Sequence, residues 1–275
     1  MPDPNQGRQS ERQPLGERLD NFFKKTPALV LVLSVSGLVT AVSTLVGAVG
    51  LIAFWLKHPT WQSVEYERLS KLRAGVTLQK FEEQLGQPSY RSLHTAPGIT
   101  GTTTESVFQR NGYWVDVMSD SSDTVQAYAV TACKDDFNPT FSYWDGTGNS
   151  RIVLNKTHVG EVRNGGAWAK ISILNTAPSY VFEVLPDDDA TDYKGHALGL
   201  NDVCHPFDNA AWVDWIDKHP PRGNNGIVAK QITALDKVGR NLIDSTTINT
   251  FAETANDTTM DIYSGPIGVS RSLVR

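Results

Sequence analysis

The residues best able to carry out chemistry gather near position 200 of this 275-residue chain. Asp202, Cys204 and His205 place a carboxylate, a thiol and an imidazole close together, and His196 and His219 lie nearby in the sequence. These groups could bind zinc, or Cys204 and a histidine could form a nucleophile–base pair. However, the adjacent side chains of Cys204 and His205 would point to opposite faces of a strand, and no second Cys or His lies at the usual ligand spacing. The sequence therefore predicts no resident metal or cofactor here.

The two cysteines of the chain, Cys133 and Cys204, have a plainer use. Outside the cytoplasm they could form one disulfide, which would close a loop of 71 residues and stabilise the fold by up to about 4 kcal/mol. The alternative is a pair of buried free thiols. Cys133 and Cys204 are thus the candidate disulfide of the chain, provided that this region is exported.

Other sequence signatures of catalysis or ligand binding are missing. The chain has no GxxxxGK[ST] phosphate loop, no GxSxG nucleophile elbow, no HExxH zinc motif and no CxxC pair. Asp187, Asp188 and Asp189 suggest calcium, but an EF-hand loop starting at Asp187 requires glycine at its sixth position, where Asp192 stands. A solvated acidic turn is the better interpretation.

The longest apolar segment runs from Ala28 to Leu56, 29 residues without a charge. As a helix it would extend about 43 Å, against about 30 Å for the hydrocarbon core of a bilayer. It is flanked by residues typical of membrane interfaces, namely Phe22, Phe23, Lys24, Lys25, Trp55, Lys57 and Trp61. A cleaved signal peptide is the alternative, but its apolar region would have only about 7–15 residues. The sequence therefore predicts a transmembrane helix at 28–56, embedded in the lipid bilayer.

The membrane segment suggests an orientation for the rest of the chain. Residues 1–27 are rich in Pro, Gln and Arg near their start, and we expect a disordered cytoplasmic tail. The lysine pair at the membrane edge favours this orientation, which would make the protein a single-pass protein of the cell membrane with its large domain outside the cytoplasm. Small residues four apart in the helix, such as Ser43 and Gly47, would allow a homodimer to form through it.

Charge argues against one class of partner. The chain has 25 Lys and Arg against 30 Asp and Glu; the tail holds five of the former and four of the latter, which leaves a net charge of −6 for residues 57–275. An acidic domain without a basic stripe lacks the electrostatic attraction on which most nucleic-acid binding depends. We therefore expect no nucleic-acid partner.

The predicted fold class is α+β. Residues 61–133 read as two helices, Trp61–Arg73 and a second one capped by Thr77, followed by an antiparallel meander. The turn Asn111–Gly112 joins its first two strands, because this pair suits the positive φ angles of a tight hairpin. The whole chain is thus expected to hold a transmembrane helix, this helix–helix–meander module and a second mixed subdomain.

The second subdomain is predicted at 150–275, after a Pro-, Gly- and Asn-rich connection at 135–150. Strands are expected at 152–154, 169–174 and 180–185. The pattern of 209–219 fits a helix or a strand, since a possible cap and two following prolines favour the former and its alternation favours the latter. The apolar spacing from Val228 to Leu242 predicts one amphipathic helix.

The segment from Gly75 and Thr77 through Phe81 and Leu85 to Pro88 carries a family resemblance. With the meander that follows, residues 62–133 resemble the SmpA/OmlA-like module of bacterial envelope lipoproteins. That resemblance implies two helices on a three-stranded sheet and a role in interactions within the envelope. It supplies no catalytic residue, and the chain lacks the family's lipid-anchoring cysteine. The layout as a whole resembles bacterial single-pass membrane proteins that offer no activity to carry over.

The sequence therefore predicts a membrane-anchored, non-enzymatic interaction protein of the bacterial cell envelope, with another envelope protein as its partner. The alternative is a membrane-tethered hydrolase or a metal-binding protein that uses Cys204, His205 and Asp202. A third hypothesis is a sensor that signals through pairing of its membrane helix.

Overall fold

The structure is a computed structural model, and it describes residues 60–95, 101–144, 149–162, 168–173, 179–185, 194–204, 210–220, 228–255, 260–262 and 266–270. The predicted tail at 1–27 and the predicted membrane helix at 28–56 lie outside these ranges. Among the residues described, no helix is both long and apolar enough to cross a bilayer.

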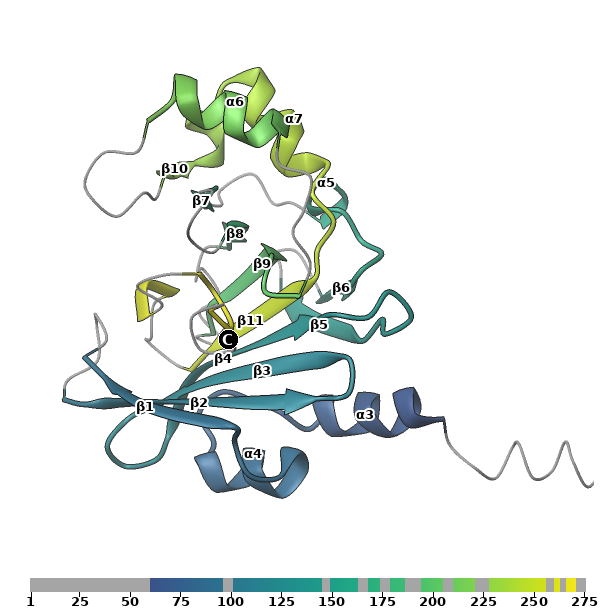
Figure 1. The fold of residues 1–275 in the computed structure, drawn as a ribbon, viewed down its shortest axis with the longest axis vertical. Helices are drawn as coiled ribbons and strands as arrows, with labels where there is room; N and C mark the ends of the chain where they lie inside the picture. The colour runs from purple at the N-terminus through teal and green to yellow at the C-terminus, as the bar shows by residue number, and fades with distance from the viewer. Residues whose placement is uncertain are drawn as a thin grey trace, which may run out of the picture. The chain divides into compact units, whose positions relative to one another are not determined.

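The described strands form a nine-stranded antiparallel sheet with a few helices, so the fold is α+β (Figure 1). In spatial order the strands are β1 (Tyr90–His94), β2 (Thr103–Arg110), β3 (Tyr113–Ser119), β4 (Val125–Ala132), β11 (Thr250–Thr254), β9 (His196–Asn201), β8 (Tyr180–Val184), β7 (Trp168–Ser172) and β10 (Val228–Gln231). The seam between β4 and β11 joins strands from the two predicted parts of the chain. Residues 61–133 and 150–275 thus contribute to one continuous sheet.

The helix–helix–meander arrangement predicted for the first part is confirmed in its secondary structure. Helices α3 (Trp61–Leu69) and α4 (Leu78–Leu85) precede β2, β3 and β4, and Gly112 adopts the positive φ angle, +94°, that its hairpin turn requires. Thr77 occupies the N-cap position of α4, but its side chain makes no capping hydrogen bond. Strand β1, which the sequence did not predict, adds an edge to the meander.

The connection predicted at 135–150 contains regular structure. Strand β5 (Thr140–Trp144) pairs with β6 (Asn149–Val153) in a separate two-stranded hairpin. Asn138 and Pro139 precede β5, and Asn149 is the first residue of β6. The hairpin packs its Phe141 and Ile152 side chains into the main core.

The single helix predicted from Val228 to Leu242 is wrong. The segment begins as β10, which forms an edge of the sheet by pairing with β7, continues as a short 3₁₀ turn (Ile232–Ala234), and only then forms α7 (Lys237–Asp244). Val238, which the helical pattern places on the core side, is 56% exposed. Residues 210–218, which the sequence left open, form helix α6, because Trp212, Trp215 and Ile216 then share one buried face.

Two hydrophobic cores lie on opposite faces of the sheet. The larger one packs α3, α4, the β5–β6 hairpin, α5 (Val159–Val162), α6 and α7 against one face. The smaller one covers the other face with a C-terminal segment that includes the 3₁₀ turn Met260–Ile262 and Ile267. Figure 1 shows α4 beside β1 and β2, and α6 and α7 together near β10.

Candidate functional site

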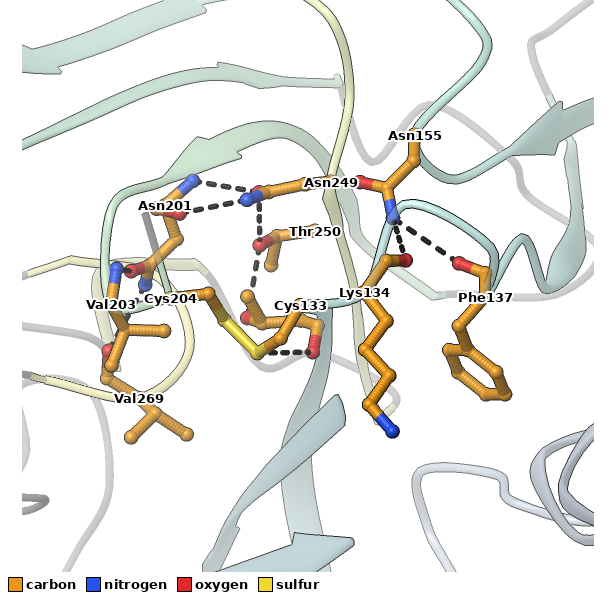
Figure 2. Close-up of a disulfide and its surroundings, with 11 residues drawn as sticks. Cys133, Lys134, Phe137, Asn155, Asn201, Val203, Cys204, Asn249, Thr250 and Val269 are labelled. Carbon is orange, nitrogen blue, oxygen red and sulfur yellow. Dashed lines mark hydrogen bonds between the residues drawn. A yellow bond between two sulfur atoms is a disulfide. The ribbon is translucent and has the colours of Figure 1, made fainter. Parts of the chain in front are cut away.

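The cysteine-centred cluster that the sequence singled out is a structural element in this fold. Cys133, just after β4, and Cys204, after β9, are joined by a disulfide, with their Cα atoms 5.1 Å apart (Figure 2). Because strand β11 lies between β4 and β9 in the sheet, the disulfide links the two strands that flank it. The sulfur of Cys204 is bonded to Cys133 and offers no thiolate. Asp202 is buried, and His205 lies outside the described residues.

Asn201 and Asn249 reinforce the same junction (Figure 2). The backbone N–H of Asn201 donates to Oδ1 of Asn249 at 2.8 Å, and Nδ2 of Asn249 donates back to the carbonyl oxygen of Asn201 at 2.8 Å. Nδ2 of Asn201 also donates to the carbonyl oxygens of Ile267 and Val269, both at 3.1 Å. These amides satisfy buried backbone groups, so their role is to hold the strand ends and the C-terminal segment together.

The two histidines near the cluster in sequence have separate surroundings. His219 stacks on Trp215, with ring centroids 4.6 Å apart, and belongs to the packing of α6. His196 lies on β9 and lines a cleft elsewhere on the sheet. Within the described part of the chain, no group of three or more His, Cys, Asp and Glu residues is placed to hold a metal ion.

This cleft is the best candidate for a functional site, with a volume of about 500 Å³. It opens where the end of α3, the β5–β6 hairpin and the middle strands of the sheet meet. Its walls therefore come from segments widely separated along the chain. The lining residues are Leu69, Ser70, Arg73, Tyr128, Thr140, Phe141, Ser142, Tyr143, Asn149, Lys194, His196, Phe251 and Glu253.

Three polar side chains lie in one row across the floor of the cleft. Glu253 on β11 is the register partner of Tyr128 on β4 and of His196 on β9. Direct partners on neighbouring strands place their Cβ atoms about 5 Å apart. A phenol, a carboxylate and an imidazole are thus side by side in a site where each is at least nine-tenths buried.

The carboxylate in this row is held by two donors. Oε1 of Glu253 accepts hydrogen bonds from the backbone N–H of Ala74 at 2.8 Å and from Nζ of Lys194 at 3.0 Å. The Lys194 and Glu253 side chains are only 18% and 7% exposed. Because the ion pair is largely shielded from water, it fixes the carboxylate in one position.

Arg73 lies beside the row and brings a second positive charge to the cleft. Its Nη1 donates to the carbonyl oxygen of Leu72 at 2.5 Å. Burial raises the pKa of the Tyr128 hydroxyl well above its ordinary value, the negative charge of Glu253 raises it further, and Arg73 acts in the opposite direction. Tyr128 is therefore a neutral phenol at physiological pH, able to donate a hydrogen bond.

Aromatic rings form the inner wall of the cleft, and small polar side chains form its rim. Phe141 of the hairpin stacks on Phe251 at a centroid distance of 4.5 Å, and the Tyr143 ring lies 5.8 Å from the His196 ring. The exposed rim residues are Ser70, Thr140, Ser142 and Asn149. The cleft thus combines a rigid aromatic wall with hydroxyl and amide groups near its mouth, which is typical of small-ligand sites.

Comparisons with known protein families, with curated proteins and with solved structures find no match to this chain. The resemblance of residues 62–133 to the envelope lipoprotein module therefore rests on its motif residues and stays a prediction. The sequence did single out His196, but it gave no signal for Arg73, Tyr128 or Glu253, because these residues share no motif and meet only through the sheet.

Proposed function

We propose that residues 61–275 form a recognition domain that binds another component of the bacterial cell envelope, with the cleft as its binding site. The observation that carries this proposal is the cleft itself, in which buried charged groups, aromatic rings and exposed polar residues converge from five strands and one helix end. Its volume falls within the range of about 300–1,000 Å³ common to ligand sites. A cleft of this size suits a small molecule or the end of a larger chain.

The disulfide supports an extracytoplasmic location for this domain. Structural disulfides persist in oxidising compartments and are rare in the cytoplasm. In this proposal the apolar run at 28–56 anchors the domain in the lipid bilayer of the cell membrane, and the tail at 1–27 stays in the cytoplasm. Pairing of two such helices in a homodimer belongs to the same proposal, as does the envelope role implied by the resemblance.

The alternative function, a hydrolase or a metal-binding protein that uses Cys204, His205 and Asp202, receives less support. Its nucleophile or ligand would have to be a thiolate, whereas Cys204 is bonded to Cys133. The alternative therefore requires the reduced protein. Zinc content that rises only after treatment with reductant, and that is lost in Cys204→Ser, would favour it.

Site-specific photocrosslinking in intact cells tests the recognition proposal. A photoreactive amino acid is placed at Ser142 or Asn149, both exposed on the cleft rim, and at Gln109, exposed on the opposite face of the sheet. We expect one discrete crosslinked product from the two rim positions and none from Gln109. The same product from all three positions, or no product from the rim, would contradict the proposal.

A further inference from the structure

The charges in the cleft do not balance. Among its lining residues the full charges are those of Arg73, Lys194 and Glu253, and His196 adds an imidazole. Lys194 and Glu253 neutralise each other through their ion pair. Arg73 has no ion-pair partner within the described part of the chain, so one guanidinium charge is left over at the site.

The guanidinium of Arg73 also has hydrogen-bonding capacity to spare. It carries five N–H donors, and within the described residues its Nη1 donates to the carbonyl oxygen of Leu72. A guanidinium presents its donors in a planar fork, which matches the paired oxygens of a carboxylate or a phosphate. Arg73 is exposed to the cleft mouth, where a ligand can reach it.

From these observations we infer that the cleft binds an oxyanion, a carboxylate or phosphate group carried by a polar, hydroxyl-bearing ligand, and that Arg73 is the residue that holds it. This inference rests on the proposed function and names its ligand class. The hydroxyl groups of Ser70, Thr140 and Ser142 and the amide of Asn149 line the cleft and can bond to the polar body of such a ligand. The ion-paired Glu253 lies deeper and is placed to accept from a ligand hydroxyl.

A ligand series with one common body tests the inference on the purified full-length protein. Glucose, glucuronate and glucose 6-phosphate share a sugar ring but carry no charge, a carboxylate and a phosphate, respectively. We expect glucuronate, glucose 6-phosphate or both to bind, as measured by calorimetry at millimolar concentrations, and to bind at least tenfold more tightly than glucose. The anion that binds more tightly shows whether the cleft prefers a carboxylate or a phosphate.

Charge variants then assign the interaction to one residue. Arg73→Gln should weaken binding of the preferred anion about tenfold, because one charge-assisted hydrogen-bonded pair is lost. Arg73→Lys should bind the anion more tightly than Arg73→Gln but less tightly than the wild type, since lysine keeps the charge and lacks the paired guanidinium donors. Lys80→Gln, which removes an exposed positive charge on α4 outside the cleft, should leave the affinity unchanged.

Three results would overturn the inference: binding of glucose as tight as that of the anions, no binding of either anion, or an Arg73→Gln variant that retains full affinity. Melting curves of the variants show whether each one is folded. Failure here is distinguishable from failure of the recognition proposal. A rim-specific crosslink in cells, together with no preference for anions in solution, would support the recognition proposal and contradict only the inference that the ligand is an oxyanion.

Discussion

Glu253 accepts a hydrogen bond from the backbone N–H of Ala74, 179 residues earlier in the chain, at 2.8 Å. This contact ties β11 to the segment that leaves α3, and Arg73 immediately precedes Ala74. The same carboxylate oxygen accepts from Lys194, which precedes β9. One side chain therefore positions both cationic residues of the cleft.

Replacing Glu253 should loosen this arrangement. Glu253→Ala removes the acceptor of a buried N–H and leaves the Lys194 ammonium, 18% exposed, without its partner. We expect a loss of about 2 kcal/mol in the free energy of unfolding, measured by urea denaturation. Glu67→Ala, which breaks an exposed ion pair between α3 and Lys71 just beyond its end, should leave the free energy of unfolding almost unchanged. Equal losses in the two variants would show that Glu253 has no special role.

The disulfide should contribute a large part of the stability of the domain. The Cys133–Cys204 bond spans 71 residues, and the loss of loop entropy in the unfolded chain is worth up to about 4 kcal/mol. The Cys133→Ser/Cys204→Ser double variant should therefore unfold at a clearly lower urea concentration than the oxidised protein. Reductant should shift the wild-type midpoint toward that of the variant and leave the variant unchanged. A wild-type midpoint that is insensitive to reductant would contradict this prediction.

Position 239 in α7 requires glycine because α7 packs closely against Trp215. A Cβ atom there would lie 2.7 Å from Cε2 of Trp215, a ring that is 2% exposed and donates to Oδ1 of Asp236 at 2.8 Å. Alanine favours a helix by about 1 kcal/mol over glycine, but the clash opposes it, and we expect a net loss of about 1–3 kcal/mol. Lys237→Ala, an exposed change in the same helix, should alter stability by less than about 0.5 kcal/mol. Stabilisation by Gly239→Ala in thermal melts would refute the packing argument.

Asp116 on β3 should make stability depend on pH. Asp116 is 1% exposed, and within the described part of the chain neither of its carboxyl oxygens has a hydrogen-bond partner at normal geometry. Burial raises its pKa well above the ordinary 3.8, and the nearby Glu105 raises it further. The folded chain therefore holds this proton more tightly than the unfolded chain. The resulting stability is complete below pH 3.8 and declines as pH rises toward the raised pKa.

The neutral variant Asp116→Asn removes this dependence. The melting temperature of the variant minus that of the wild type should be several degrees larger at pH 7 than at pH 4. Asp123→Asn, an exposed change in the turn between β3 and β4, should show no such difference between the two pH values. An Asp116→Asn effect that is the same at both pH values would mean that folding does not raise the pKa of this carboxyl, and would contradict the prediction.

The sequence predicted those elements whose signals are local. Asn111–Gly112 lies between two alternating strands, and the helix from Leu78 to Leu85 has its buried residues on one face and ends at Gly86, whose φ angle is +82°. These features act within a few residues, so they can be read without knowledge of the rest of the chain.

The central strands gave no such signal. All five residues of β11 are buried, and the strand carries Thr250, Glu253 and Thr254 among its apolar residues, so it lacks any apolar alternation. It is stabilised by pairing with β4, far away in the sequence. The same reasoning applies to the cleft, whose charged residues come from three distant segments. Glu65 in α3 is a further example, because it is buried and bonded to Tyr113 at 2.5 Å and to Arg110 at 3.1 Å, residues of distant strands.

The central claim is that residues 61–275 are a disulfide-bonded recognition domain outside the cytoplasm, and thiol labelling of intact cells tests it most directly. A membrane-impermeant maleimide is applied with and without an impermeant reductant, and the labelled protein is identified by mass. We predict no labelling without reductant, and labelling of both Cys133 and Cys204 with reductant. Labelling that requires permeabilised cells, or that proceeds without reductant, would contradict the account.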